Sequence, residues 1–337
     1  MKTNNPIYIL ALALLTACEN ADVTFPDYEG GTTVYFASQY PVRTIVLGED
    51  TYQTDNDNAH RFEVYATIGG TRNNDRNVEI DIAVNNNLCN HLYFEEGVPV
   101  LPLPQEYYTL DANTISLPKT MMGAVGVQLT DKFFADNLSL ENTYVLPLAI
   151  RQVRGADHIL SGTPLIENTI PVQTNANAWS VQPKDYVLYC VKYVNRYHAN
   201  YLRRGIDLIV QNGNLQKNIR HADTMEKDEL CPITTKALRR NILPITTSFG
   251  TCKLELIFND KGECVISSTA DSPYPAMGTG HFVENGQKDG WGNGQPRDAL
   301  YLSYTIDYGT AKQETADTLV VQSRGIAPEW FTPIYVE

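Results

Sequence analysis

A period-two alternation of apolar and polar side chains runs through most of this sequence and constrains its fold more than any other feature. In the segment Asn77–Asn85 every second residue is apolar, and these residues are Val78, Ile80, Ile82 and Val84. Such alternation is typical of a strand in an antiparallel sheet with one buried and one solvated face. The one short helix expected lies near Asp131–Leu138, where apolar residues fall at helical spacing. The chain is therefore predicted to be all-β.

The first half of the chain is predicted to form a β-sandwich over residues 33–173. Its predicted strands are short and are separated by turns rich in Asn, Asp and Gly, which is typical of a sandwich. These strands are Thr33–Ala37, Arg43–Leu47, His60–Ile68, Asn77–Asn85, Tyr107–Leu110, Thr114–Leu117, Val125–Thr130, Thr143–Val153 and Asn168–Gln173.

The second half is predicted to form an antiparallel β-barrel over residues 184–337. A polar, strand-poor segment that ends in Pro183 separates it from the first half. Its predicted strands are longer, which favours a barrel or a strongly curved sheet over a flat sandwich. These strands are Tyr186–Val194, Gly205–Val210, Cys252–Phe258, Glu263–Ser267, Ala299–Tyr308 and Asp317–Ser323.

The N-terminus predicts export and a lipid anchor. Lys2 precedes an apolar run over residues 7–17, which is too short for a membrane-spanning helix of about 20 residues and suits a signal peptide over residues 1–17. The run ends in Leu-Thr-Ala before Cys18, which resembles a bacterial lipobox and predicts lipidation of the Cys18 sulfur. Acyl chains on Cys18 would hold the protein on a membrane through a tether over residues 18–32. The alternative is an ordinary secretory signal followed by a chance cysteine.

Composition excludes several partners and sites. The chain has 26 Lys and Arg against 39 Asp and Glu, a formal charge of -13, so its surface repels phosphate and no nucleic-acid partner is expected. The cysteines after Cys18 are odd in number and form no C-x-x-C pair, which argues against a disulfide framework and against zinc. Most are expected to be buried, with a bridge between Cys252 and Cys264 left open; they are Cys89, Cys190, Cys231, Cys252 and Cys264. No metal site and no cofactor is predicted.

Several segments resemble a known family. They are Thr143–Ile150 (TYVLPLAI), Val34–Phe36, Asp185–Asn195 and Asp317–Arg324. Together they resemble Bacteroidetes surface lipoproteins that carry an immunoglobulin-like N-terminal domain of unknown function and a lipocalin-like C-terminal domain. The resemblance implies these two folds for the two halves. It also implies a lipid-anchored protein at the cell surface of the outer membrane, which binds glycans beside a glycan-uptake complex.

Catalytic signatures are missing from the sequence. It contains no H-E-x-x-H, no G-x-S-x-G and no Walker loop, and it lacks the D-x-x-D-x-D-x-E motif of chitinase-like barrels. The closest pair of carboxylates on one strand face, Glu79 and Asp81, fits a solvated surface better than a glycosidase pair. The protein is therefore expected not to be an enzyme, and a carbohydrate-active enzyme is the weakest of the functions considered.

The best candidate for a ligand site is the glycine-rich segment Tyr274–Arg297. It carries Tyr274, His281 and Trp291, and flat aromatic rings beside polar groups suit the apolar faces and polar rims of sugars. The segment is interpreted as a loop at the barrel mouth; the alternative is that Trp291 plugs the barrel end. Trp179 and Trp330 are interpreted as domain-packing residues. The predicted function is non-catalytic glycan binding, and the alternative is a structural or adhesion lipoprotein that binds proteins or host surfaces.

Overall fold

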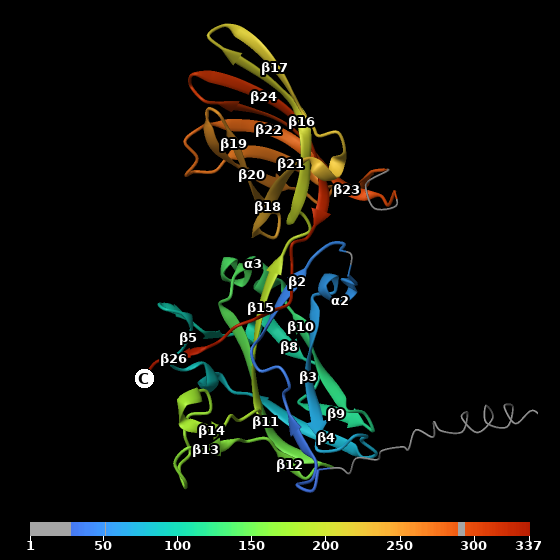
Figure 1. Ribbon diagram of the computed structural model, residues 1–337, viewed down its shortest axis with the longest axis vertical. Coiled ribbons are helices and arrows are strands. Elements are labelled where there is room, and N and C mark those ends of the chain that lie inside the picture. The colour runs from blue at the N-terminus through green and yellow to red at the C-terminus, as the bar shows by residue number, and fades with distance from the viewer. Residues whose placement is uncertain (1–27, 51, 289–293) are drawn as a thin grey trace, which may run out of the picture.

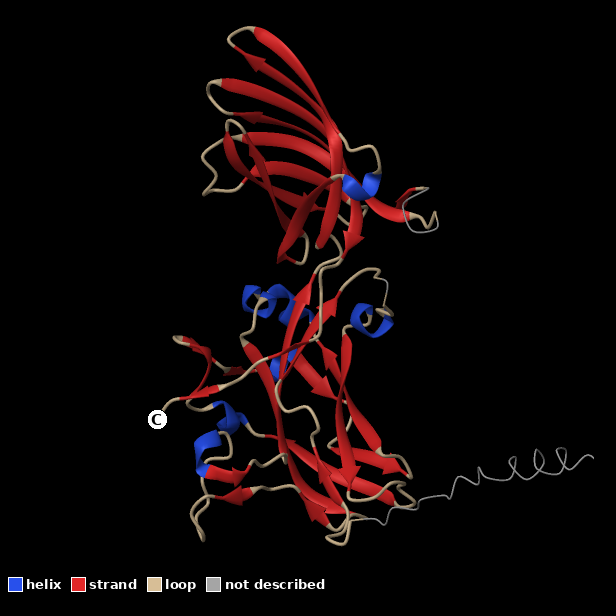
Figure 2. Ribbon diagram, in the orientation of Figure 1, coloured by secondary structure: helices blue, strands red, loops and turns tan. Residues whose placement is uncertain are grey.

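Two β-rich parts, a sandwich and a barrel, make up the part of the chain that the computed structural model describes, residues 28–50, 52–288 and 294–337. Figure 1 shows them end to end, with the C-terminal segment returning from the barrel to the sandwich. Figure 2 shows that helix is confined to short turns: α2 (Asp55–Asn58), α3 (Asp131–Ala135), η1 (Asn86–Cys89), η2 (Gln105–Tyr107), η3 (Asn137–Leu140), η4 (Ala176–Ala178) and η5 (Met225–Lys227). The predicted fold class, an all-β chain with a sandwich followed by an antiparallel barrel, is confirmed.

Two sheets form the sandwich. The first has the strand order β12 (His158–Ile159), β1 (Thr33–Tyr35), β3 (Arg61–Gly69), β10 (Met122–Leu129) and β8 (Tyr108–Leu110). The second has the order β25 (Glu329–Trp330), β2 (Pro41–Val46), β15 (Tyr186–Val194), β11 (Tyr144–Arg154), β4 (Asn77–Val84) and β9 (Thr114–Pro118), with β7 (Leu101–Pro102) beside β11. Smaller pairings join β13 (Thr163–Pro164) to β14 (Trp179–Val181), and β5 (Leu92–Glu95) to β6 (Val98–Pro99) and β26 (Ile334–Tyr335).

The apolar run of β11 is explained by burial on both faces. All seven residues from Tyr144 to Ile150 are buried. Leu146 and Leu148 belong to the core between the two sheets, whereas Val145 and Ala149 belong to a second core on the outer face of the second sheet. Because both faces are covered, this strand has no solvated side and its sequence does not alternate.

The division between the two parts differs from the expected boundary at residue 184. The strand β15, expected in the barrel, pairs with β11 and runs parallel to β2 inside the sandwich. The C-terminal strands β25 and β26 also pair with sandwich strands, β2 and β5. Alternation identifies β15 as a strand but does not identify its partners, since pairing depends on segments that are remote in the sequence.

Eight strands close the barrel, in the chain order of an up-and-down barrel. They are β16 (Ala199–Gln211), β18 (Glu229–Ala237), β19 (Arg240–Thr247), β20 (Gly250–Phe258), β21 (Glu263–Ser268), β22 (Ala276–Gln287), β23 (Arg297–Asp307) and β24 (Ala311–Ser323). The ring closes where β16 pairs with β24. On its other side β16 pairs with β18 over residues 199–203 and with β17 (Asn214–Arg220) over residues 205–211. The hairpin β16–β17 therefore extends beyond the ring.

The predicted glycine-rich loop is largely the strand β22, and this part of the sequence interpretation is wrong. Gly278 and Gly280 lie where inward side chains are expected, and a Cβ on Gly278 would come within 2.3 Å of the Ser303 carbonyl oxygen and 2.6 Å of the Tyr304 Cα. The glycines thus let β22 pack closely against β23, which suits a tightly curved barrel wall.

Candidate functional site

The structure places two of the sequence-predicted ligand residues, Tyr274 and His281, at different heights of the barrel wall. Tyr274 precedes β22 at the barrel end away from the sandwich, where its hydroxyl donates to the Phe249 carbonyl over 3.0 Å and its ring packs against Tyr308. His281 is exposed in the middle of β22, and its ring stacks on Tyr301 with centroids 5.0 Å apart. Trp291 and Cys18 lie outside the described residues. The ligand role of Tyr274, His281 and Trp291 stays a prediction.

A groove with a volume of about 570 Å³ lies on the sandwich instead. Residues 37–65, which include the strands β2 and β3 and the segment around α2, form its walls together with Tyr189 of β15 and the C-terminal segment 326–330. We name it the aromatic groove, and its lining includes Ser38, Pro41, Val42, Arg43, Thr44, Tyr52, Gln53, Asp57, Val64, Tyr65, Tyr189, Pro328, Glu329 and Trp330. Its volume lies within the roughly 300–1,000 Å³ typical of ligand pockets.

The groove collects most of the exposed aromatic side chains. In residues 28–50, 52–288 and 294–337, four Phe, Tyr or Trp side chains are exposed: Tyr28 at 71%, Tyr52 at 77%, Tyr65 at 51% and Trp330 at 65%. All of them except Tyr28 line the groove. Large aromatic rings are costly to leave in water, so three in one concavity indicate a surface built to be covered by a ligand.

The Trp330 ring is held in place although it is exposed. Its indole Nε1 donates to the Ser38 hydroxyl over 3.1 Å, and its backbone lies in β25 opposite Pro41. The neighbouring Glu329 accepts from Lys192 over 2.7 Å and from Asn142 over 2.8 Å. A ring fixed in this way loses little freedom when a ligand covers it, which favours binding.

The charged groups of the groove are already paired. Arg43 forms an ion pair with the buried Asp57, whose other carboxylate oxygen accepts from the Val46 backbone N–H over 3.0 Å. The Lys192 and Asn142 hydrogen bonds outweigh the burial of Glu329 and lower the pKa of its carboxyl. Burial raises the pKa of Tyr189, so its phenol stays protonated at neutral pH. The groove is thus an aromatic surface with locally neutralised charges.

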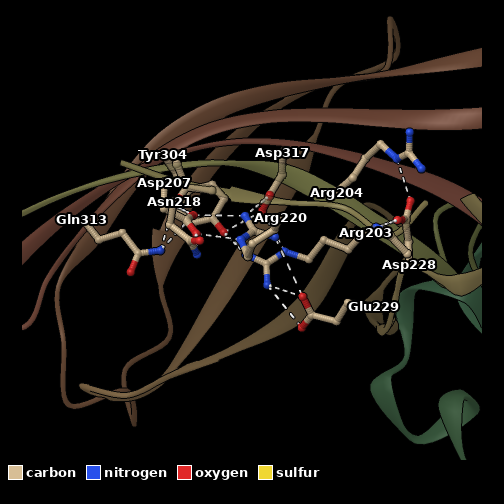
Figure 3. A network of polar contacts seen from close by, with 12 residues as sticks. Arg203, Arg204, Asp207, Asn218, Arg220, Asp228, Glu229, Tyr304, Gln313 and Asp317 are labelled. Atoms are coloured by element: carbon tan, nitrogen blue, oxygen red, sulfur yellow. Dashed lines mark hydrogen bonds and ion pairs between the residues drawn. The ribbon is translucent and has the colours of Figure 1, made fainter. Parts of the chain in front are cut away.

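A second polar cluster lies inside the barrel, and Figure 3 shows its members converging on two carboxylates. Asp317 accepts from Arg203 Nε over 2.9 Å, from the Tyr304 hydroxyl over 2.8 Å and from Arg220 Nη2 over 2.5 Å. Asp207 accepts from Arg220 Nε over 2.6 Å. We name this cluster the ion network; further contacts to it come from Gln313, Thr315, Asn218 and Glu229.

The ion network joins the strands that close the barrel. Burial alone would favour a protonated Asp207, but hydrogen bonds from Arg220 and Thr315 outweigh it and lower the pKa of the carboxyl. Burial and the charge of Asp317 together raise the pKa of Tyr304 well above its usual value. A Cβ on Gly205 would come within 2.3 Å of Asp317 Oδ1, so a glycine is needed where β16 passes the network.

Other sequence-level candidates have structural roles. The five cysteines from Cys89 to Cys264 are buried and free, as expected, and the alternative bridge between Cys252 and Cys264 is not formed. His198 accepts from the Thr235 backbone N–H over 3.2 Å, and burial lowers its pKa to about 4. No group of three or more His, Cys, Asp or Glu side chains in the described part of the chain is placed to hold a metal ion.

Sequence reasoning missed the aromatic groove because its signal is spread over the whole chain. Trp330 was expected to pack between domains, yet 65% of its surface is exposed. Tyr52, Tyr65 and Trp330 lie in three separate segments, and no local motif joins them. The one available signal was the C-terminal Trp330 itself, which follows Pro328 and Glu329 in a segment without alternation.

Comparison with known proteins adds two domain matches. The domain of unknown function DUF5627 matches residues 196–325, which correspond to the barrel. A second family model, described as an N-terminal domain, matches residues 28–157 of the sandwich. No curated protein matches the sequence. No helix among the described residues has the length and apolar character needed to cross a membrane.

Solved structures include relatives from Bacteroides. A Bacteroides ovatus protein of unknown function is 40% identical, with a TM-score of 0.85, and the match covers 92% of this chain and 100% of that one. A second Bacteroides ovatus protein of unknown function is 14% identical, with a TM-score of 0.40 and coverage of 89% and 99%. A Bacteroides thetaiotaomicron protein described as an auxiliary nutrient binding protein is 12% identical, with a TM-score of 0.38 and coverage of 86% and 95%.

Proposed function

We propose a glycan-binding function for this chain, which belongs to the same Bacteroidetes family as the Bacteroides ovatus protein of unknown function. In this proposal the protein is a non-catalytic lipoprotein of the outer membrane that binds an oligosaccharide or polysaccharide in the aromatic groove. The observation that carries the proposal is the gathering of Tyr52, Tyr65 and Trp330, three of the four exposed Phe, Tyr and Trp side chains of the described residues, in one groove.

The chemistry of the groove favours a sugar over other ligands. A sugar ring has an apolar C–H face that packs on a flat aromatic ring, and hydroxyls that bond to the polar rim. Trp330 and Tyr52 offer such rings, while the lining also carries the polar side chains of Ser38, Thr44 and Gln53. Because Arg43 is paired with Asp57 and Glu329 with Lys192, we propose a neutral glycan.

The volume of the groove and its three aromatic side chains favour a chain of sugars over a single sugar. At about 30 Å³ for each water molecule, a groove of about 570 Å³ has the space of about nineteen waters. This is more space than one sugar residue fills. Three aromatic side chains from separate segments offer more than one stacking position. An oligosaccharide that contacts several of them would bind more tightly than a monosaccharide.

Affinity electrophoresis of the protein without its signal peptide, through gels that contain neutral polysaccharides, tests this function. The wild-type protein is expected to be retarded by at least one of them, and Tyr52→Ala is expected to remove most of the retardation. Tyr28→Ala is the matched control, since Tyr28 is equally exposed but lies outside the groove. Equal loss in both variants, or no retardation of the wild type by any polysaccharide, would contradict the proposal.

The membrane location is part of the proposal and rests on the sequence. Lipidation of Cys18 would anchor the chain through a tether before β1. Cys18→Ala is expected to release the protein from the membrane fraction. If the variant stays with the membrane, the lipid anchor is not what holds it there. The proposed lack of catalysis predicts that no reducing sugar is released from the polysaccharide that retards the protein.

The alternative function, contact with other proteins, is favoured by a different surface. The outer face of the hairpin β16–β17 exposes two opposed pairs of apolar side chains, Ile206 with Ile219 and Val210 with Leu215, and between them Leu208, which lies opposite Lys217. Exposed apolar patches of this kind mark interaction sites. Crosslinking on intact cells tests it: a partner captured by the wild type and lost in Ile206→Lys, without any glycan binding, would favour adhesion.

A further inference from the structure

Residues 160–183 form a small lobe on the sandwich that has no part in the aromatic groove. Within it β13 pairs with β14, and its two ends meet where the Lys184 backbone N–H donates to the Leu160 carbonyl over 2.8 Å. Figure 1 shows β13 and β14, together with β12, at the end of the sandwich away from the barrel. We name residues 160–183 the base lobe.

The base lobe exposes several apolar side chains to water. Ile166 is 70% exposed and Ile170 is fully exposed. Further exposed apolar side chains lie in the same lobe, namely Leu165, Val172 and Val181. Exposed apolar side chains gathered in one short stretch of chain indicate a surface that a partner covers.

Hydrogen bonds within the base lobe hold it in shape. The Thr169 hydroxyl donates to the Ile166 carbonyl over 2.7 Å and closes the turn that carries the two most exposed side chains. Trp179 Nε1 donates to the Val172 carbonyl over 3.0 Å and ties the chain after this turn to β14. The apolar side chains are thus presented on a preformed surface, which reduces the entropy lost when a partner covers it.

The base lobe is nearly free of charge. Charged residues make up 19% of the whole chain, yet residues 160–183 contain one, Glu167. Complementary charges usually fix the register of a protein partner, and this surface offers almost none. A lipid surface needs no such register. In a chain with a formal charge of -13, an uncharged lobe also approaches an anionic membrane with the least repulsion.

The position of the N-terminus indicates which surface covers the base lobe. β1 pairs with β12, directly before the lobe, and the Phe36 backbone N–H donates to the Lys184 carbonyl, directly after it, over 2.9 Å. The described chain begins at Tyr28, five residues before β1. Fully extended, residues 18–27 reach at most about 36 Å, at about 3.6 Å for each residue. Acyl chains on Cys18 would therefore hold this end of the sandwich close to the membrane.

We propose that the base lobe lies on the lipid bilayer, with Ile166 and Ile170 at the boundary between headgroups and acyl chains. The turn carries backbone polar groups that need water or headgroups, so the contact is interfacial. This inference rests on the proposed lipid anchor and does not depend on glycan binding. The anchor holds the protein on the membrane, and the lobe sets its orientation. Figure 1 shows α2, beside the groove, at the barrel end of the sandwich, so the groove lies away from the bilayer.

Fluorescence quenching on vesicles tests the inference. The acylated protein is reconstituted into vesicles of phosphatidylcholine and phosphatidylethanolamine, with and without a nitroxide spin label on the lipid acyl chains. A fluorescent thiol label on Ile170→Cys reports the lobe, because the five cysteines from Cys89 to Cys264 are buried and do not compete for it. The matched control carries the same label on Leu215→Cys, an exposed apolar position of the hairpin β16–β17.

The two labels are expected to respond differently to the nitroxide lipid. The label at position 170 should lose fluorescence at least about twofold, because an interfacial segment lies about 5–10 Å into the boundary between headgroups and acyl chains. The label at position 215 should be unchanged, because β17 belongs to the barrel, at the other end of the molecule (Figure 1).

Charge placed on the base lobe gives a second test. The double change Ile166→Asp, Ile170→Asp lies at exposed positions and is expected to leave the fold and the lipid anchor intact. A label on Val172→Cys, quenched in the otherwise unchanged protein, is expected to lose its quenching in this variant, since carboxylates are costly to bring into lipid. The same double change on the hairpin, Val210→Asp, Leu215→Asp, is the control and should leave the quenching of the label at position 172 unchanged.

Flotation of the vesicles in a density gradient separates this inference from the proposed function. Protein that does not float would contradict the lipid anchor and this inference with it, and retardation in polysaccharide gels would still decide glycan binding. If the protein floats, equal quenching at positions 170 and 215 would overturn the lipid contact and leave the anchor standing. Quenching at position 172 that survives the two carboxylates would do the same. A shift of the label at position 170 to shorter wavelength without quenching would mean that protein covers the lobe, and would also overturn the inference.

Discussion

Single side chains with unusual partners define this molecule at the scale of residues. Arg220 uses two of its nitrogens on Asp207 and Asp317, and Trp330 is exposed but tied to Ser38. His198 is the opposite case, because burial and the positive charge of Arg324 keep its ring neutral. Each of these roles comes from the environment of the residue and not from its type.

Acidification is expected to destabilise the protein through His198. Its pKa is lowered from 6.5 to about 4, so between these values the unfolded chain binds the proton more strongly than the folded chain. Neutral His198 makes its full contribution to the free energy of unfolding above pH 6.5, and this contribution is lost as the pH falls toward 4. Urea unfolding of the wild type should show that the free energy of unfolding falls by an amount on the order of 1–2 kcal/mol between pH 7 and pH 5, and this His198-dependent fall should be absent in His198→Gln. An equal loss in both proteins would exclude His198 as the cause.

In the strand β22, close packing of its backbone against the neighbouring strand β23 takes the place of buried side chains. Its inward positions carry Gly278 and Gly280, while Met277, Thr279 and His281 point outward and are exposed. The backbone of β23 occupies the space that a side chain at Gly278 would need. A wall of this kind has an apolar interior supplied by the facing strands.

Gly278→Ala is expected to destabilise the barrel by at least about 2 kcal/mol, since the added methyl meets backbone atoms of Ser303 and Tyr304 that cannot move away. Thr279→Ala is the matched change one residue further on, at an exposed position, and should cost less than about 1 kcal/mol. Thermal melts of both variants measure the difference. Similar melting temperatures would mean that β22 does not pack closely against β23.

Alternation predicted many strands but not all, and the exceptions have physical reasons. The face of Leu300, Leu302 and Ile306 was predicted and lies in the barrel core. In contrast, β17 is exposed along nearly its whole length and so has no buried face to alternate against. β18 and β19 contain Pro232 and Pro244, which weaken a strand signal, and β22 has glycine in place of apolar residues. The predicted strand Asn168–Gln173 is not formed.

The aromatic groove was beyond sequence reasoning for a related reason. It joins residues from near Ser38 to Trp330, and only the fold brings these segments together. None of the described residues of the predicted segment 274–297 lines it.

The two parts of the molecule are joined by more than the chain connection at Asn195. Arg324, at the end of the barrel, is buried and donates to the carbonyls of Leu47 and Asn195 over 3.0 and 2.7 Å. It also donates to the backbone carbonyls of Glu49 and His198 over 2.8 and 2.7 Å. After Arg324 the chain returns to the sandwich as β25 and β26, so that Trp330 reaches the groove.

Arg324→Met is expected to uncouple the barrel from the sandwich. The change leaves four backbone carbonyls without their shared donor. Because hydrogen bonds to charged groups contribute about 1.5–3 kcal/mol each to stability, the free energy of unfolding should fall by at least about 3 kcal/mol. Calorimetric unfolding should show two separate transitions where the wild type shows one. Arg239→Met, which removes an exposed ion pair with Asp260, is the control and should leave a single transition. A single transition in Arg324→Met would mean that other contacts couple the two parts.

Fluorescence of Trp330 alone tests the central claim, that the aromatic groove binds glycan, most directly. In the double variant Trp179→Phe, Trp291→Phe the emission comes from Trp330, which is 65% exposed in the free protein. Addition of an oligosaccharide from the polysaccharide that retards the protein is predicted to shift this emission to shorter wavelength, with a saturation curve that matches the affinity measured in gels. Retardation in gels without any change in Trp330 emission would contradict the account and place the glycan elsewhere.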